Sequence, residues 1–157
     1  SRTRFNYTMM GDNVNLAARM ESGANAWGTY AMCTEVTKRA CEKHGERVIF
    51  RPLGRVVVMG RSQPVPVYEI AGLRESTPPA TLDCINLFSR GLEHYYQRNW
   101  DAAAVCFNKS SQLEAHIPGE TTGIGSNPSL IYLEIVRKLK MEPPPEAWSG
   151  VFVMHEK

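Results

Sequence analysis

The chain has 157 residues, 43% of them hydrophobic and 22% charged, and this composition is that of a folded globular protein rather than a disordered tail. Its formal net charge of +2 is too small to indicate nucleic-acid binding, so no nucleic-acid partner is expected. The four cysteines lack a C-x-x-C spacing, and no apolar run approaches the roughly 20 residues of a membrane span, which argues against a zinc site, a disulfide framework and a spanning helix.

The first half of the chain alternates between predicted strands and predicted helices, which indicates an α/β or α+β domain. The predicted strands cover residues 5–10, 29–33, 48–50, 56–59 and 65–70. The predicted helices cover residues 12–25 and a segment from Thr34 or Glu35 to about Lys43. A glycine and a proline lie between the last two strands, a pattern that is typical of a β-hairpin.

The second half is predicted to be mostly helical, because apolar residues recur there at helical spacing. The predicted helices cover residues 81–97, 100–114 and 129–140. The first two are expected to nest against each other as a hairpin. The small and large residues that permit this are Gly91, Tyr95, Ala103 and Phe107. The apolar tail over residues 148–154 is expected to dock as an extended segment.

The most informative stretch of the chain runs from Phe5 to Glu21 and contains two polar residues at a helical spacing. Asn15 and Arg19 lie four residues apart in the predicted helix, so their side chains share one face. A neutral amide beside a permanently charged guanidinium suits a substrate that develops negative charge on a phosphate. An isolated pair of this kind would also fit the polar face of an ordinary surface helix.

This stretch resembles the class III nucleotidyl cyclases, in the pattern G-[DN]-x-V-N-x-A-x-R that runs from Gly11 to Arg19. The similarity covers residues 4–73 and includes the segments Arg51-Pro52-Leu53-Gly54 and Pro66-Val67-Tyr68-Glu69-Ile70. It implies that Asn15 and Arg19 are catalytic residues that contact the ribose and the triphosphate. In this reading they stabilise the negative charge that develops at the cyclising phosphate.

The resemblance also implies an α+β fold class and a division into domains. Residues 1–75 correspond to the C-terminal half of the cyclase catalytic domain, a partial ferredoxin-like fold. Residues 76–81, which contain a Pro-Pro pair, are expected to form a linker. Residues 82–157 resemble the α-helical, tetratricopeptide-like C-terminal extension of bacterial cyclases, which ends in an extended tail. A protein partner that binds this extension is a further expectation.

Thr8 occupies the position at which many family members read the base of the substrate. A subgroup of bacterial and soluble adenylyl cyclases carries Thr there, and its hydroxyl can accept a hydrogen bond from the adenine amino group. The resemblance therefore favours ATP over GTP as the substrate. Guanylyl cyclase activity is one alternative, and a plain β-branched strand residue is the other.

Arg61 lies in the predicted hairpin turn, where relatives commonly read V-K-G-K and use a lysine to hold the phosphates. This chain reads Val58-Met59-Gly60-Arg61, so the first basic position is lost and arginine replaces the second lysine. Arg61 is a candidate substrate-binding residue, because a guanidinium can pair with a phosphate through two hydrogen bonds. The alternative is an exposed arginine without a partner.

Catalysis in this family requires two Mg²⁺ or Mn²⁺ ions, which two Asp residues hold in the first half of the domain. No segment of this chain matches that half, so no metal ligand is expected here, and we expect a fragment that is inactive alone. The resemblance implies a homodimer through the cyclase domain, and an exposed sheet edge offers a second route to pairing. A cytoplasmic location is expected, with a membrane anchor in missing N-terminal segments of the parent as the alternative.

The parent enzyme is expected to convert ATP to cyclic AMP and pyrophosphate in signal transduction. The alternative hypothesis is a non-catalytic interaction or regulatory module whose cyclase half is vestigial. The helical pair and the altered V-K-G-K segment favour that alternative. The sequence that precedes Ser1 separates the two hypotheses, because only the enzyme requires two metal-binding Asp residues there.

Overall fold

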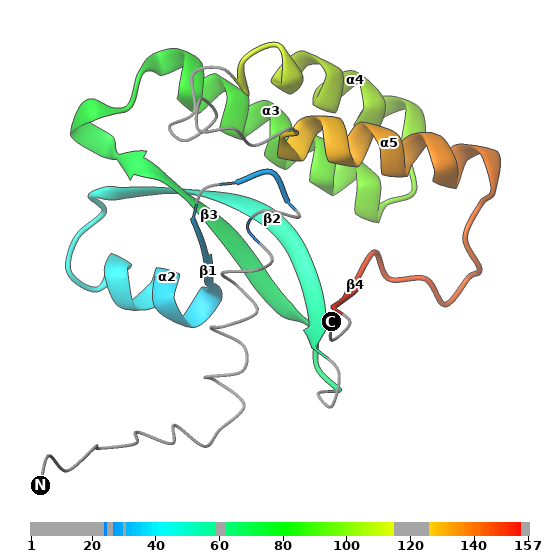
Figure 1. Ribbon diagram of the computed structural model, residues 1–157, viewed down its shortest axis with the longest axis horizontal. Coiled ribbons are helices and arrows are strands. Elements are labelled where there is room, and N and C mark those ends of the chain that lie inside the picture. The colour runs from blue at the N-terminus through cyan, green and yellow to red at the C-terminus, as the bar shows by residue number, and fades with distance from the viewer. Residues whose placement is uncertain (1–23, 25–26, 30, 59–61, 115–125, 155–157) are drawn as a thin grey trace, which may run out of the picture.

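The computed structural model describes residue 24 and residues 27–29, 31–58, 62–114 and 126–154 (Figure 1). Within these residues the chain forms a four-stranded sheet and four α-helices, which confirms the α+β prediction. The elements are β1 (Met32–Thr34), α2 (Glu35–Glu42), β2 (Val48–Val58), β3 (Val65–Leu73), a 3₁₀ turn (Arg74–Ser76), α3 (Pro79–Tyr96), α4 (Trp100–Ser111), α5 (Pro128–Met141) and β4 (Phe152–Met154). None of the described helices is both long and apolar enough to cross a membrane.

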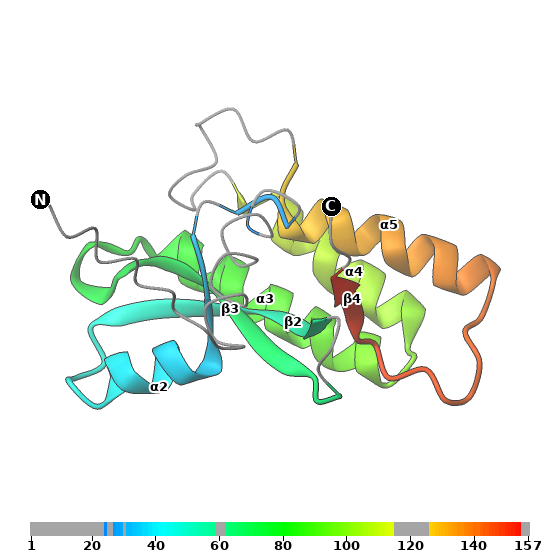
Figure 2. The same cartoon turned by 60° about the horizontal axis from the view of Figure 1, so that its bottom comes forward.

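The sheet has the strand order β1-β3-β2-β4. The β2–β3 hairpin forms its centre, and β3 pairs with β1 on its other side, both in antiparallel register. The helices α3, α4 and α5 form a layer over one face of the sheet, while α2 lies against the opposite face (Figures 1 and 2). Lys38 of α2 accordingly lies above the rings of Phe50 and Tyr68, at 5.9 and 5.2 Å from their centroids.

Strand β2 is longer than the sequence predicts, because the predicted segments 48–50 and 56–59 belong to one continuous strand as far as Val58. The residues between them include Pro52 and Gly54, which ordinarily interrupt a strand. Here the β2–β3 register shifts between these two residues, and Gly54 takes a φ of +130°. A local irregularity of this kind lets the strand continue past residues that fit a regular ladder poorly.

The predicted extended tail is confirmed, and it joins the sheet as a fourth strand. Strand β4 pairs in parallel with β2, with Val56 opposite Phe152 and Val57 opposite Val153. Because β4 is an outer strand, it covers the side of β2 that faces away from β3. The predicted segments 5–10 and 12–25 lie outside the described residues, apart from Ala24, which is helical and buried.

The helices of the second half lie close to their predicted positions. Helix α3 begins at Pro79, inside the predicted linker, because proline is well suited to the first turn, where its missing N–H costs no hydrogen bond. The side chains of Asn99 and Asn127 cap α4 and α5 by accepting hydrogen bonds from backbone N–H groups. The predicted nesting is also confirmed, since a Cβ atom at Gly91 would meet a ring carbon of Phe107 at 2.7 Å.

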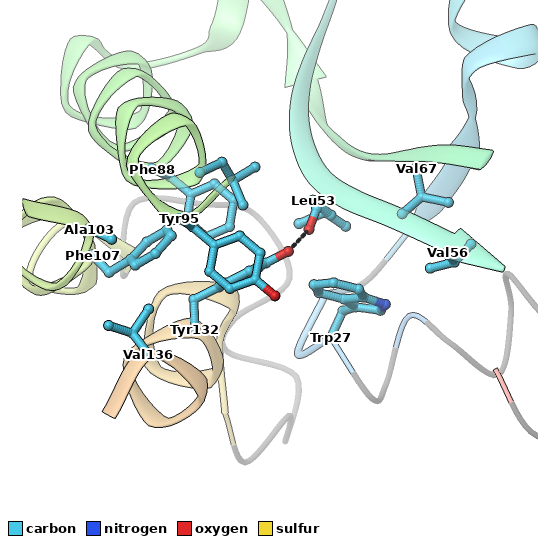
Figure 3. Packing of buried hydrophobic residues seen from close by; sticks show 11 residues of the cluster. Trp27, Leu53, Val56, Val67, Phe88, Tyr95, Ala103, Phe107, Tyr132 and Val136 are labelled. Carbon is cyan, nitrogen blue, oxygen red and sulfur yellow. Dashed lines mark hydrogen bonds between the residues drawn. The ribbon is translucent and has the colours of Figure 1, made fainter. Parts of the chain in front are cut away.

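A large hydrophobic core joins the sheet to the helical layer (Figure 3). The sheet side and the turn before β1 contribute Trp27, Leu53, Val56 and Val67. The helices contribute Phe88, Leu92, Tyr95, Ala103, Phe107, Tyr132 and Val136. The predicted division between residues 75 and 82 thus runs through a shared core, and the domain boundaries themselves stay a prediction.

Candidate functional site

The four residues that the sequence proposes for substrate contact are Thr8, Asn15, Arg19 and Arg61, and all of them lie outside the described residues. The described structure instead contains the segments that flank them. One is the turn at residues 27–29, which follows the predicted helix over residues 12–25. The other is the end of the β2–β3 hairpin, which flanks Arg61.

The turn at residues 27–29 is packed tightly against the helical layer. The backbone N–H and the hydroxyl of Thr29 both donate to the carbonyl oxygen of Ala24, at 2.9 and 3.3 Å. Gly28 has a φ of +68°, and a Cβ atom there would lie 2.6 Å from the carbonyl oxygen of Ser126. The backbone of this turn can therefore approach the start of α5 only because residue 28 is glycine.

Trp27 anchors this turn in the core. Its ring centroid lies 5.6 Å from that of Tyr132 in α5 and 4.8 Å from that of Phe152 in β4, the second contact being edge-on. Such aromatic pairs stabilise a fold beyond the area that they bury. The turn that follows the predicted helix over residues 12–25 thus rests on residues of the second half of the chain.

The second flanking segment is the end of the hairpin. Val56 of β2 lies opposite Val65 of β3 on one side and opposite Phe152 of β4 on the other. Val56 is fully buried, so this part of β2 is fixed by packing as well as by the ladder. Strand β2 ends two residues later, at Val58, and Arg61 itself lies outside the described residues.

A buried ionic cluster that the sequence analysis did not identify lies between the sheet and the helical layer. The Arg51 guanidinium on β2 contacts the Glu69 carboxylate on β3 and the Glu114 carboxylate after α4, each at 2.5 Å. These side chains are only 1–3% exposed. Burial alone would lower the pKa of Arg51, but the two carboxylates raise it overall. Arg51 is therefore held as a cation at the centre of the interface.

Two serines extend this cluster into the helices. The Ser129 hydroxyl donates to the Glu114 carboxylate at 2.6 Å, and its oxygen lies 2.6 Å from the Ser110 hydroxyl oxygen. Nearby, the Cys84 thiol donates to the carbonyl oxygen of Ser110 at 3.4 Å. Together these contacts join β2, β3, α3, α4 and α5 around one buried arginine.

The strand pattern contained a signal for this cluster. Along β2, Arg51 falls between Ile49 and Leu53, so it shares their inward-facing side, because side chains alternate along a strand. Along β3, Glu69 stands in the same way between Val67 and Ala71. Glu114 follows the end of α4, and no such periodicity marks it.

The thiol of Cys84 should make the protein less stable as the pH rises through the alkaline range. Burial raises its pKa from 9.0 to about 12, and the Glu114 carboxylate adds to this increase. Since the folded-state pKa lies above the unfolded value, the contribution to stability is complete below pH 9 and declines above it. Between pH 9 and pH 11 we expect this residue to reduce the free energy of unfolding by about 2 kcal/mol.

Urea denaturation across this pH range checks the contribution of the thiol. The stability difference between the wild-type chain and Cys84→Ala should shrink by that amount as the pH rises. The control is Val136→Ala, which shortens a buried apolar side chain and introduces no titratable group. A Cys84→Ala difference that stays constant from pH 8 to pH 11 would contradict the prediction.

Within the described part of the chain, no group of three or more His, Cys, Asp or Glu side chains is arranged to hold a metal ion. The Mg²⁺ or Mn²⁺ ions of the intact enzyme stay an expectation of the resemblance.

Comparison with known proteins identifies two adenylate cyclases as relatives. The chain is 36% identical over 73 residues to adenylate cyclase 1 of Rhizobium meliloti, a match that covers 46% of this chain and 10% of that protein. It is 24% identical over 135 residues to the terminal-differentiation-specific adenylate cyclase of Dictyostelium discoideum, covering 85% of this chain and 6% of that protein. The chain thus spans a tenth or less of either relative.

These similarities support a relationship to adenylate cyclases. No protein-family model matches the chain, and no solved structure matches it.

Proposed function

We propose that this chain is the part of a class III adenylate cyclase that contributes the phosphate-binding and base-reading residues of the active site. The observation that carries the proposal is the unbroken motif from Gly11 to Arg19, in a chain related to two adenylate cyclases. The intact enzyme would convert ATP to cyclic AMP and pyrophosphate. Its metal ions would be held by residues that this chain does not contain.

Each proposed residue has a distinct role. Arg19 supplies a permanent positive charge and Asn15 a neutral amide to the ribose and the triphosphate. Thr8 accepts a hydrogen bond from the adenine amino group, and Arg61 adds a phosphate contact from the hairpin turn. The metal ions of the intact site would activate the ribose 3′-hydroxyl for in-line attack on the α-phosphorus.

The proposal is tested by titrating the isotopically labelled chain with ATP and measuring the binding affinity by NMR. We expect Arg19→Ala to weaken ATP binding by about 10- to 100-fold, because a hydrogen bond to a charged group contributes about 1.5–3 kcal/mol. Asn15→Ala should weaken it by about tenfold or less, since its amide is neutral. Thr8→Ala should reduce the preference for ATP over GTP.

The control is Arg90→Ala, which removes an exposed arginine from α3, in the second half of the chain. Equal ATP affinity of the wild-type chain and Arg19→Ala would contradict the proposed role of Arg19. The chain alone should make no cyclic AMP with Mg²⁺ or Mn²⁺, so formation of cyclic AMP would contradict the view that it holds only part of the site.

A further inference from the structure

The chain after α5 does not continue as a helix but returns to the sheet as an extended strap, defined here as residues 143–154 (Figures 1 and 2). It begins with three prolines, which lack a backbone N–H and cannot continue the helix. Their carbonyl oxygens still need donors where the segment packs against the protein. Pro143 and Pro145 are exposed to solvent, so the segment is held to the rest of the chain by those carbonyl oxygens that do accept from protein donors.

Arg98 supplies most of these donors. Its guanidinium donates to the carbonyl oxygens of Pro145 and Glu146 at 2.7 and 2.8 Å, and to those of Pro144 and Trp148 at 3.3 Å. Arg98 lies in the turn between α3 and α4 with a φ of +61°, a conformation that non-glycine residues rarely adopt. A single side chain from the helical layer thus holds the first half of the strap.

Further contacts hold the middle of the strap against the core. Trp148 packs edge-on against Tyr95 and Trp100, with ring centroids 5.1 and 5.4 Å apart. The Arg55 guanidinium of β2 donates to the carbonyl oxygen of Ser149 at 3.2 Å. Gly150 follows with a φ of +73°, where a Cβ atom would lie 2.8 Å from the ring of Tyr96.

The far end of the strap contacts both segments that flank the proposed substrate residues. As β4 it pairs with Val56–Val58, the last residues of β2 before the connection that contains Arg61. Through Phe152 it also packs on Trp27, which lies three residues beyond helical Ala24. Strand β4 therefore contacts both Trp27 and the end of β2.

We infer that the strap positions the substrate-binding half of the active site, with Arg98 as the positioning residue that anchors it. The inference rests on the proposed function, in which the segment that carries Asn15 and Arg19 and the connection that carries Arg61 contact the same nucleotide. The helical layer then acts on the site through a defined route, from the α3–α4 turn through the strap to Trp27 and β2. Arg98 itself makes no contact with substrate in this arrangement.

The test combines backbone amide exchange with ATP affinity, both measured on the labelled chain at a temperature where every variant is folded. Arg98→Ala should speed amide exchange in β2 and β4 by releasing the strap. It should also weaken ATP binding by about threefold to tenfold, because binding residues lose affinity when their support loosens. Phe152→Leu, which keeps Arg98 but removes the ring that packs on Trp27, should weaken ATP binding in the same direction.

The matched control is Ile85→Val, which loses a buried methylene in a separate hydrophobic cluster with Ile49 and Ala71. Ile85→Val should lower stability without changing ATP affinity. If Arg98 had only a structural role, the folded Arg98→Ala variant would also bind ATP with unchanged affinity. Unchanged ATP affinity with a released strap, or a strap that stays in place, would overturn the inference and leave the proposed function intact. Failure of the wild-type chain to bind ATP would overturn both.

Discussion

Replacement of Arg51 by alanine is expected to lower the free energy of unfolding by about 3–5 kcal/mol, because it leaves two buried carboxylates without their cation. Glu69 and Glu114 both lie within 2.5 Å of the guanidinium and are about as buried as Arg51 itself. The Arg51 guanidinium also lies 4.9 Å from the ring centroid of Phe88 in α3. The substitution thus disturbs the sheet and the helical layer together. Urea denaturation at pH 7 measures the change.

The matched control for this prediction is Arg47→Ala. Arg47 pairs with Glu75 at 2.6 Å, but both side chains are well over half exposed to solvent. Water screens such a pair, so its loss should cost less than about 1 kcal/mol. If Arg51→Ala costs no more than Arg47→Ala, the cluster is not the buried ionic junction that the structure describes.

A variant without any of the three charges separates stability from specificity. Replacement of a whole buried ion cluster by apolar residues is often neutral or stabilising, since no charge then has to leave water. The combination Arg51→Met, Glu69→Leu and Glu114→Leu should therefore be more stable than Arg51→Ala alone. If that variant also reached the stability of the wild-type chain, the cluster would contribute little net stability and would chiefly fix how the helical layer docks on the sheet.

Among the described residues, local signals predicted the helices well and the strands less well. The helical spacing of apolar residues is a local pattern, and α4 and α5 begin within one residue of their predicted starts. Strand β2 was predicted as two pieces, and Pro52 and Gly54, which ordinarily interrupt a strand, lie between them. The pairing with β3 that carries β2 through the irregularity depends on residues some 15 positions away.

The same distinction applies to the candidate site: its local motif could be predicted from the sequence, but its long-range contacts could not. The motif around Asn15 and Arg19 is local, so the resemblance could identify it without a structure. The contact between Trp27 and Phe152 joins residues near opposite ends of the chain, and no periodicity or spacing predicts it. The same holds for Arg98, whose role depends on a segment more than forty positions away.

Tyr132 of α5 contacts both halves of the chain, and its replacement should cause the second large loss of stability. Its fully buried ring packs against aromatic residues of the sheet side and of the helical layer (Figure 3). These neighbours are Trp27, Phe88, Tyr95, Phe107 and Phe152. Its hydroxyl donates to the carbonyl oxygen of Leu53 in β2 at 2.6 Å. One side chain of α5 thus fills the core and satisfies a buried acceptor of the sheet.

Two substitutions at Tyr132 separate these contributions. Tyr132→Phe keeps the ring but leaves the Leu53 carbonyl without its donor, which should cost about 1–3 kcal/mol of unfolding free energy. Tyr132→Ala also creates a large cavity, and loss of a buried aromatic ring alone costs about 3–5 kcal/mol. Leu130→Ala on the same helix is the control, because Leu130 is 48% exposed and its loss should change stability far less.

The same variants test whether the shared core makes the two halves unfold as one unit. Since Tyr132 contacts both, Tyr132→Ala should lower the urea midpoint of the sheet and of the helical layer together, in a single transition. NMR signals from β3 and from α4 would report the two parts separately. If the β3 signals kept the wild-type urea midpoint while the midpoint of the α4 signals fell, the two halves would unfold as independent domains.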